Sequence, residues 1–372
     1  MRAAILYAAV PPGTVHTQAN TLRMEELEQP EPRGGEIGVA ITCSSLCHSD
    51  LSVVDGSRVR PLPMALGHEA VGRVAALGPG VTDVDVGDHV VLVFVPSCGS
   101  CRACLAGRPA LCHRAAEVNG SGDLLHGDAL LRTASGERIN HHLGVSAFSE
   151  YAVVARESAV VIPDDVPDTV AAMFGCAVLT GMGAVLNTAE VTPGQSVAVV
   201  GLGAVGLSAV MAARLAGAVH IIAIDPNRGK HRFARDCGAT AAGTPEEAEG
   251  LVEEATGDGV DVTVEAVGSA AVMAASLGLL TRGGALVSVG LPHPSAQLAV
   301  PALQFAGAGK RLLGSYMGDS VPERDIPRYL GFWREGKLPV ELLHTDTRPL
   351  EEINEGLDAL AAGTVIRRLF RA

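Results

Sequence analysis

The stretch Ser196-Val-Ala-Val-Val200-Gly201-Leu-Gly203-Ala-Val-Gly206 joins a short apolar run to a glycine-rich loop, and an alanine-rich helical run follows it to Ala216. This order is typical of a strand, a tight turn and a helix. The glycines permit close approach of the backbone to a ligand, so that a pyrophosphate can sit on the amides and the dipole at the helix N-terminus. The stretch therefore predicts a dinucleotide site at Gly201, Gly203, Ala204, Val205 and Gly206.

The next apolar run, His220 to Ile224, ends at Asp225. A carboxylate at this distance from the glycine loop accepts hydrogen bonds from the adenosine ribose hydroxyls and would repel a 2′-phosphate. We therefore expect NAD rather than NADP as the cofactor. Arg228 is the nearby residue that could favour NADP instead.

Two regions of the chain differ in their pattern of apolar residues. Helical stretches alternate with apolar runs at 196–200, 220–224, 260–266 and 285–289, which predicts a doubly wound parallel sheet covered by helices, a Rossmann α/β domain. Before about residue 155, short β-branched runs such as 36–42, 70–77 and 89–95 predict a β-rich domain. From about Val321 four prolines separate short elements. Met1 to Val10 contain a short apolar stretch, but it runs into Pro11-Pro12 without a cleavage pattern, so we expect a first strand there.

Composition restricts the class of function. The chain has 41 acidic and 28 basic residues and a net charge of −13, which disfavours binding to nucleic acids or anionic membranes. No apolar run is long enough to cross a bilayer without an interrupting Gly, Pro or charge. We expect a cytoplasmic protein that acts on a small molecule.

The segment Cys98-Gly-Ser-Cys101-Arg-Ala-Cys104, followed by Cys112, places four thiols in one compact lobe. Four thiolates fit a closed tetrahedral zinc site, which has no position for a substrate and therefore stabilises the fold. An iron–sulfur cluster and disulfides are the alternatives. The bacterial cluster motif has its fourth cysteine closer and followed by proline, whereas the last spacing here is longer and His113 follows.

Three further motifs are dispersed: Cys47-His48-Ser49-Asp50, Gly67-His68-Glu69 and Gly175-Cys176. Taken separately, each is compatible with ordinary buried residues. Together with the four-cysteine lobe and the glycine loop, they occur in the order and spacing of the zinc-containing medium-chain alcohol dehydrogenases. The resemblance extends along essentially the whole chain and includes Phe148-Ser-Glu-Tyr-Ala-Val-Val and Ile353-Asn-Glu-Gly.

This resemblance implies a GroES-like catalytic domain at 1–177 and 321–372, clasping a Rossmann domain at 178–320. It implies a catalytic zinc bound by Cys47, His68 and Cys176, which leaves a fourth position for water or substrate oxygen, and a reversible hydride transfer between an alcohol and NAD that gives an aldehyde or ketone. With the structural zinc, the resemblance implies two Zn²⁺ per chain.

Other roles also follow from the resemblance alone. Ser49 takes the alcohol proton, Asp50 orients His68 and Glu69 can exchange with water on zinc. Further residues are assigned by the same resemblance to the pyrophosphate (His48, Arg367), to the adenosine ribose (Lys230) and to the substrate pocket (Phe94, Leu291, Tyr316, Met317).

The sequence departs from the family where many relatives have a relay histidine, because Ser52 stands there. A mycothiol- or glutathione-dependent formaldehyde dehydrogenase is the nearest alternative. The glutathione enzymes carry Asp and Arg where this chain has Ser57 and Ala116, which disfavours that version, whereas the mycothiol version stays open. Arg58 and Arg60 could meet an acidic substrate, although such residues are usually solvated. A non-catalytic zinc protein that retains the fold is the alternative of another class, but all three catalytic zinc ligands are present.

The long segment from His113 to His142 resembles the dimeric members of the family. The run Arg311 to Tyr316 should lie at a sheet edge, where an exposed apolar strand requires cover. We expect a homodimer joined through the Rossmann domains.

Overall fold

Two groups of mutually contacting residues divide the chain in its structure, a computed structural model that describes residues 1–372. The first, called here the β-rich unit, comprises Met1–Cys176, Val321–Pro327 and His344–Ala372. The second, the α/β unit, comprises Ala177–Ser320 and Arg328–Leu343. The segment after Val321 is thus shared between the units.

The β-rich unit contains two sheets. The four-stranded sheet has the order β2 (Leu22–Glu26), β1 (Arg2–Leu6), β4 (Met64–Ala65) and β7 (Asn140–His141). The larger sheet has the order β16 (His344–Pro349), β17 (Arg367–Arg371), β3 (Glu36–Ser45), β5 (Ala70–Leu77), β6 (His89–Leu92) and β9 (Ala159–Val161), with β8 (Tyr151–Ala155) also paired with β3. The expected β-rich domain, including its first strand, is confirmed.

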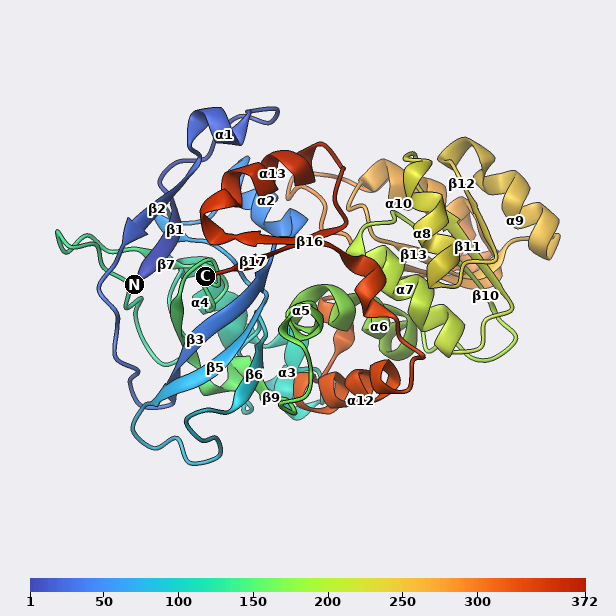
Figure 1. Cartoon of the computed structure of the whole chain (residues 1–372). Coiled ribbons are helices and arrows are strands. Elements are labelled where there is room, and N and C mark those ends of the chain that lie inside the picture. The colour runs from blue at the N-terminus through green and yellow to red at the C-terminus, as the bar shows by residue number, and fades with distance from the viewer. The chain divides into compact units, whose positions relative to one another are not determined.

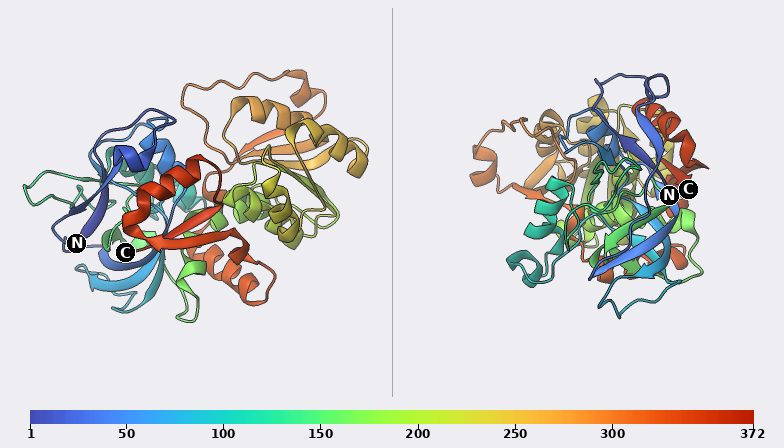
Figure 2. Two further views of the ribbon diagram at one scale, coloured as in Figure 1. Left: turned by 45° about the horizontal axis from the view of Figure 1, so that its top comes forward. Right: turned by 90° about the vertical axis from the view of Figure 1, so that its left-hand side faces the viewer.

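Most helices of the β-rich unit are short, because prolines and glycines interrupt the chain. They are α1 (His16–Ala19), α2 (His48–Val54), α3 (Arg102–Leu105), α4 (His113–Ser121), α5 (Asp168–Ala171) and α13 (Ile353–Ala361), with single 3-10 turns at Pro109–Leu111, Arg156–Ser158 and Leu350–Glu352. Strand β17 pairs with β3 through Leu369 and Ser45, which attaches the C-terminal segment to the sheet. The two termini lie near one another in both views of Figure 2.

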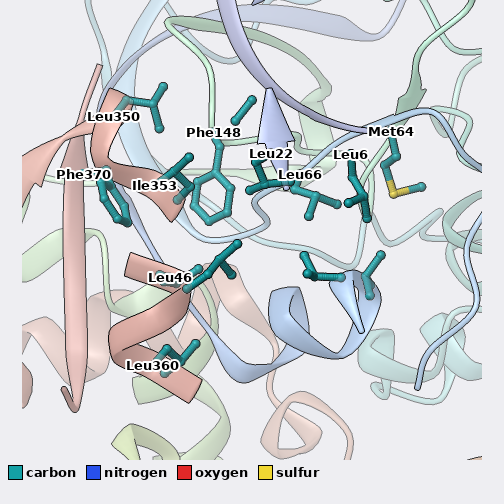
Figure 3. Packing of buried hydrophobic residues seen from close by; sticks show 14 of the residues in the cluster. Leu6, Leu22, Leu46, Met64, Leu66, Phe148, Leu350, Ile353, Leu360 and Phe370 are labelled. Carbon is teal, nitrogen blue, oxygen red and sulfur yellow. The ribbon is translucent and has the colours of Figure 1, made fainter. Parts of the chain in front are cut away.

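A buried apolar cluster holds the segments that will carry the site (Figure 3). Leu46 and Leu66 belong to this cluster and are both 1% exposed or less. Phe148 and Phe370 pack edge to face, with ring centroids 6.2 Å apart. Leu46 directly precedes Cys47, and Leu66 lies two residues before His68. Burial of these leucines therefore fixes the start of both dispersed motifs.

The α/β unit is built on one parallel sheet of six strands (Figure 1). Its order is β12 (Ala241–Gly243), β11 (His220–Ile224), β10 (Ser196–Val200), β13 (Val260–Glu265), β14 (Leu280–Ser288) and β15 (Arg311–Gly314). Every pair of neighbouring strands is parallel. Strand order reverses at β10, which is the pattern of a doubly wound fold. The predicted Rossmann architecture is confirmed.

Helices connect the parallel strands of the α/β unit, as parallel pairing requires. They are α7 (Ala204–Leu215), α8 (Gly229–Cys237), α9 (Ala248–Thr256), α10 (Ala270–Gly278) and α11 (Leu303–Ala306), with α6 (Leu179–Gly183) before them and short turns at Pro245–Glu247, Met317–Asp319 and Val340–Leu343. Helix α12 (Pro322–Arg334) includes residues of both units.

One helical run, Asp168–Thr188, is long and apolar enough to cross a membrane by length and composition. It contains π-helical turns at Phe174–Val178 and Ala184–Thr188. Because 89% of its apolar window is buried inside the protein, it has the burial of a core helix rather than a surface that faces lipid.

Candidate metal centres and cofactor loop

Cys47 lies at the N-terminal end of α2 and is 7% exposed. Its backbone N–H donates to Asp50 Oδ2 at 2.9 Å, so one carboxylate oxygen caps the first turn. The other oxygen, Asp50 Oδ1, accepts from His68 Nδ1 at 2.9 Å. Asp50 therefore links two of the three predicted ligand segments.

His68 stands between β4 and β5 and is 1% exposed. Gly67 before it has a φ of +90°, and a Cβ there would lie 2.5 Å from the backbone nitrogen of Phe148, so only glycine fits. Because Nδ1 of His68 is bonded to Asp50, Nε2 is the nitrogen that points away from it. Nε2 is buried without a hydrogen-bond partner, which is costly unless a metal uses it.

Cys176 completes the group from the π-helical turn Phe174–Val178. π-Helical turns are frequent at functional sites. The Cys176 N–H donates to Glu69 Oε1 at 3.1 Å, so the residue that follows His68 fixes the backbone of the third ligand.

The ligand atoms of Cys47, His68 and Cys176 all lie within 4.8 Å of one another, and all three residues are buried. Two thiolates and one imidazole are typical of a catalytic zinc site that keeps one position open. The carboxylate behind the histidine is the usual outer-sphere partner of such a site. The predicted ligand set therefore fits zinc.

Arg367, at the start of β17, brings a buried positive charge to this centre. Its Nη1 donates to the Leu46 carbonyl at 2.6 Å and lies 3.4 Å from Glu69 Oε2, and its Nη2 lies 3.5 Å from Cys47 Sγ. A hydrogen bond from Cys176, together with the charge of Arg367, lowers the pKa of Cys47 well below its usual value against the effect of burial. Cys47 is thus favoured as the thiolate, the form that binds metal.

Burial raises the pKa of Asp50, but its interactions with His68 and His142 outweigh burial and bring the pKa to about 2. Asp50 is therefore ionised wherever the protein is folded near neutral pH. An ionised Asp50 requires a proton on His68 Nδ1, and this leaves Nε2 as the metal-binding nitrogen.

The four cysteines Cys98, Cys101, Cys104 and Cys112 also have ligand atoms within 4.8 Å of one another. The Cys101 and Cys104 sulfurs are 3.5 Å apart, close to the ~3.8 Å expected for two thiolates on one tetrahedral zinc with Zn–S bonds of about 2.3 Å. The Cys112 sulfur accepts from the N–H groups of Cys98 and Ala115, and all four cysteines are free of disulfides. The lobe fits a closed zinc site.

Ser49 and Phe94 are close to the three-ligand centre. Ser49 Oγ lies 3.8 Å from Cys47 Sγ, and the Phe94 ring meets His68 edge to face at 5.6 Å. Ser52, which stands where relatives have a histidine, donates instead to the backbone carbonyl of His48 at 3.0 Å. His48 itself is exposed, and its predicted contact with the pyrophosphate stays a prediction, as does that of Arg367.

The glycine loop between β10 and α7 has the predicted form, with Gly203 at the N-cap of α7. A Cβ on Gly206 would lie 1.8 Å from the Gly201 carbonyl oxygen, so the third glycine permits the close packing of loop on helix. Ala204 and Val205 form the first turn of α7. The loop presents backbone amides at a helix N-terminus, as a pyrophosphate requires.

Asp225 follows β11 and holds the loop directly: Oδ2 accepts from the Leu202 N–H at 2.8 Å and Oδ1 from the Asn227 N–H at 2.8 Å. Lys230 Nζ lies 3.3 Å from Asp225 Oδ2. Arg228 instead pairs with Glu247 at 2.8 Å, between exposed side chains. The structure thus brings Asp225 and Lys230 together at the loop and engages Arg228 elsewhere.

The other residues predicted for the substrate pocket belong to the α/β unit. Leu291 is 48% exposed and Met317 is 2% exposed, whereas Tyr316 is half-buried. Their part in a pocket stays a prediction.

Sequence reasoning missed one residue of the three-ligand centre. His142 is 1% exposed, and its Nδ1 lies 3.4 Å from Asp50 Oδ1. Burial lowers the pKa of His142 and prevails over the opposing charge of Asp50. The only signal in the sequence was the pair His141-His142, which has no recognisable spacing to the other motifs.

Known proteins share this organisation. Residues 33–164 match the family "Alcohol dehydrogenase GroES-like domain", and residues 204–334 match "Zinc-binding dehydrogenase". The chain is 35% identical over 358 residues to an alcohol dehydrogenase class-3 from Myxine glutinosa, covering 94% of each chain. An alcohol dehydrogenase zinc-binding domain protein from Burkholderia ambifaria is 35% identical with a TM-score of 0.93, covering 100% of this chain and 98% of that one.

Benzyl alcohol dehydrogenase from Acinetobacter calcoaceticus has a TM-score of 0.90 and 30% identity, again covering 100% of this chain and 98% of that one. The GroES-like character of the β-rich unit is thereby confirmed. With its three-ligand centre, four-cysteine lobe and glycine loop, the chain belongs to the zinc-containing medium-chain alcohol dehydrogenase family.

Proposed function

We propose that the protein oxidises apolar primary alcohols, with benzyl alcohol as the first candidate, to the aldehyde with NAD, and catalyses the reverse reaction. The observation that carries the proposal is the buried set of Cys47, His68 and Cys176, in which the free nitrogen of a carboxylate-bound histidine joins two thiols. Phe94 beside His68 supplies an apolar wall. The similarity to a benzyl alcohol dehydrogenase supports the choice of substrate.

When bound, zinc lowers the pKa of the alcohol hydroxyl and NAD accepts the hydride. The chain's own residues prepare that step. Asp50 fixes the tautomer and the ring direction of His68. Ser49, with its hydroxyl beside the Cys47 sulfur, takes the alcohol proton. The Ser52 hydroxyl is engaged by the His48 carbonyl, so Ser52 does not replace the relay histidine that many relatives carry at this position.

The test is a spectrophotometric scan of alcohols with NAD and of aldehydes with NADH. We expect benzyl alcohol and other apolar primary alcohols to be oxidised without any thiol. A parallel arm supplies formaldehyde with mycothiol or with glutathione. Oxidation seen only in that arm would replace this proposal by a thiol-dependent formaldehyde dehydrogenase, and inactivity in every arm would refute both.

NAD should be preferred to NADP by at least about tenfold in kcat/KM, the scale of one charge-assisted interaction of about 1.4 kcal/mol. Asp225 would repel a 2′-phosphate, and the charge of Arg228 is already paired with Glu247. Asp225→Ser should erode the preference, whereas Asp236→Ser, on the exposed side of α8, should leave it intact. Equal use of both cofactors by the unmodified enzyme would show that Asp225 does not decide the choice.

We also propose that the enzyme is a cytoplasmic homodimer joined through its α/β units. Strand β15 is the edge of the six-stranded sheet, and its Leu312 is 39% exposed. Pairing two such edges across a two-fold axis would cover both. Light scattering should give a dimer. Leu312→Arg should shift it towards the monomer, while Val219→Arg, at an exposed position away from this edge, should not. A monomer, or a tetramer that persists on dilution, would contradict the proposal.

A further inference from the structure

Asp50 Oδ1 is approached by two imidazoles. His68 Nδ1 lies 2.9 Å from it and His142 Nδ1 lies 3.4 Å from it. The two rings meet edge to face, with centroids 5.3 Å apart and planes at 85°. All three side chains are 1% exposed or less. A buried carboxylate thus stands between the histidine that binds zinc and a second histidine that no motif includes.

Strand pairing places His142 beside His68 and Asp50. Strands β4 and β7 are parallel, with Met64 opposite Asn140 and Ala65 opposite His141. The residues that follow the two strands therefore emerge at the same end of the sheet. The chain after β7 stays beside the chain after β4, because the Ala147 N–H donates to the Gly67 carbonyl and the Phe148 N–H to the Leu66 carbonyl, both at 3.0 Å.

The backbone of His142 is held in a fixed turn. Its N–H donates to Ser146 Oγ at 3.0 Å, and its carbonyl accepts from the N–H groups of Val145 and Ser146. Leu143 and Ser146 have φ values of 52° and 55°, a left-handed conformation that is uncommon for such residues. Strained turns of this kind persist only where the surroundings require them, and here the turn directs the His142 ring at Asp50.

The carboxylate has a limited set of partners. Oδ2 accepts from the Cys47 N–H and Oδ1 from His68, so His142 is the one further side chain that meets Oδ1. Its ring also stands against the ring of His68 and limits rotation of that ligand. Asp50, His68 and His142 have ligand atoms within 4.8 Å of one another. Only the His68 Nδ1 contact of 2.9 Å is a hydrogen bond, whereas His142 Nδ1 faces the same oxygen at 3.4 Å, beyond the usual hydrogen-bond distance.

We propose that His142 is a positioning residue for the catalytic zinc: with its Nδ1 3.4 Å from Asp50 Oδ1 and its ring packed on His68, it holds the carboxylate–imidazole pair in the orientation that retains the metal. This inference rests on zinc binding by Cys47, His68 and Cys176. It does not depend on which alcohol is oxidised, so it is tested by metal release instead of turnover.

The test measures the rate at which purified, zinc-loaded protein releases zinc to an excess of a coloured chelator. His142→Leu, which removes the ring nitrogen that faces Asp50 and keeps an apolar side chain, should release the catalytic zinc at least about tenfold faster, the usual effect of losing an outer-sphere partner. His142→Asn, whose amide nitrogen stands near the position of Nδ1, should stay within about threefold of the unmodified protein. Release from the four-cysteine site is the internal control and should not change.

A mutant cycle shows whether His142 acts through Asp50. Asp50→Asn alone should speed zinc release, and adding His142→Leu to it should have little further effect, because residues of one network are not additive. Should His142→Leu fail to fold, His142→Asn and His142→Gln decide the matter, since glutamine carries its amide one bond too far out and should retain zinc less well.

Three results would overturn the proposal. The first is zinc release from His142→Leu at the unmodified rate. The second is equal loss from the asparagine, glutamine and leucine variants, which would indicate packing alone. The third is a metal content of three zinc ions per unmodified chain, which would show that Asp50, His68 and His142 bind a metal themselves.

Discussion

Cys176→Ala is expected to lower kcat/KM for alcohol oxidation by at least about a thousandfold, or ~4 kcal/mol of transition-state stabilisation. Cys176 supplies one of three ligands, and alanine offers neither charge nor a lone pair. The variant should still fold and contain one zinc per chain, because the four-cysteine lobe does not involve this residue. Zinc content by atomic absorption and initial rates with NAD measure both effects.

The matched control for Cys176→Ala is Cys237→Ala. Cys237 is a buried thiol of α8 that is 0% exposed and outside both metal centres. Its loss should leave two zinc ions and near-normal turnover. If Cys176→Ala kept ordinary activity or both zinc ions, Cys176 would not be a ligand.

Cys101→Ala should have the largest effect on stability. Structural zinc contributes its binding free energy directly to folding, about 10–16 kcal/mol in small zinc-dependent peptides. The lobe contains only short helices, α3 and α4, and exposes Leu105 and Leu111, so little apart from the metal holds it. We expect the variant to lose one zinc and to unfold at least about 10 °C lower, since each kcal/mol shifts the Tm of a domain of this size by about 2–4 °C.

Arg102→Ala, at the exposed residue next to Cys101, is the control for Cys101→Ala and should retain both zinc ions and its Tm. A Cys101→Ala protein with two zinc ions and unchanged Tm would show that the lobe is not a metal site. Thermal unfolding followed by circular dichroism, with zinc content measured on the same samples, distinguishes the two outcomes.

The features that sequence predicted best are those in which local geometry and chemistry depend on a few adjacent residues. Gly206 permits the close approach that the cofactor loop needs, and the four cysteines of the lobe are near neighbours along the chain. The ends of the strands were harder to predict from sequence. β14 begins at Leu280 rather than at 285, because Val260 pairs with Leu280 across an irregular register that carries Gly283 and Gly284 within the strand.

His142 illustrates what sequence alone could not provide. It is far from His68 in the chain, and the two meet because β4 and β7 pair in a particular register. Asp50 approaches both histidines from α2. Such contacts depend on tertiary pairing, which leaves no fixed spacing in the sequence. For Ser52, the sequence indicated only that the relay histidine of many relatives is absent. The structure adds that the Ser52 hydroxyl donates to the His48 carbonyl within the same helix, α2.

The most direct measurement follows NADH formation while Zn²⁺ is returned to enzyme from which a chelator has removed the more readily exchanged metal ion. Chelation should remove one zinc per chain and abolish benzyl alcohol oxidation. Activity should return in proportion to added zinc and be complete at one added ion per chain, while the four-cysteine site keeps its metal throughout. Undiminished oxidation by protein with one zinc per chain would contradict the central claim that the Cys47, His68 and Cys176 centre performs the reaction.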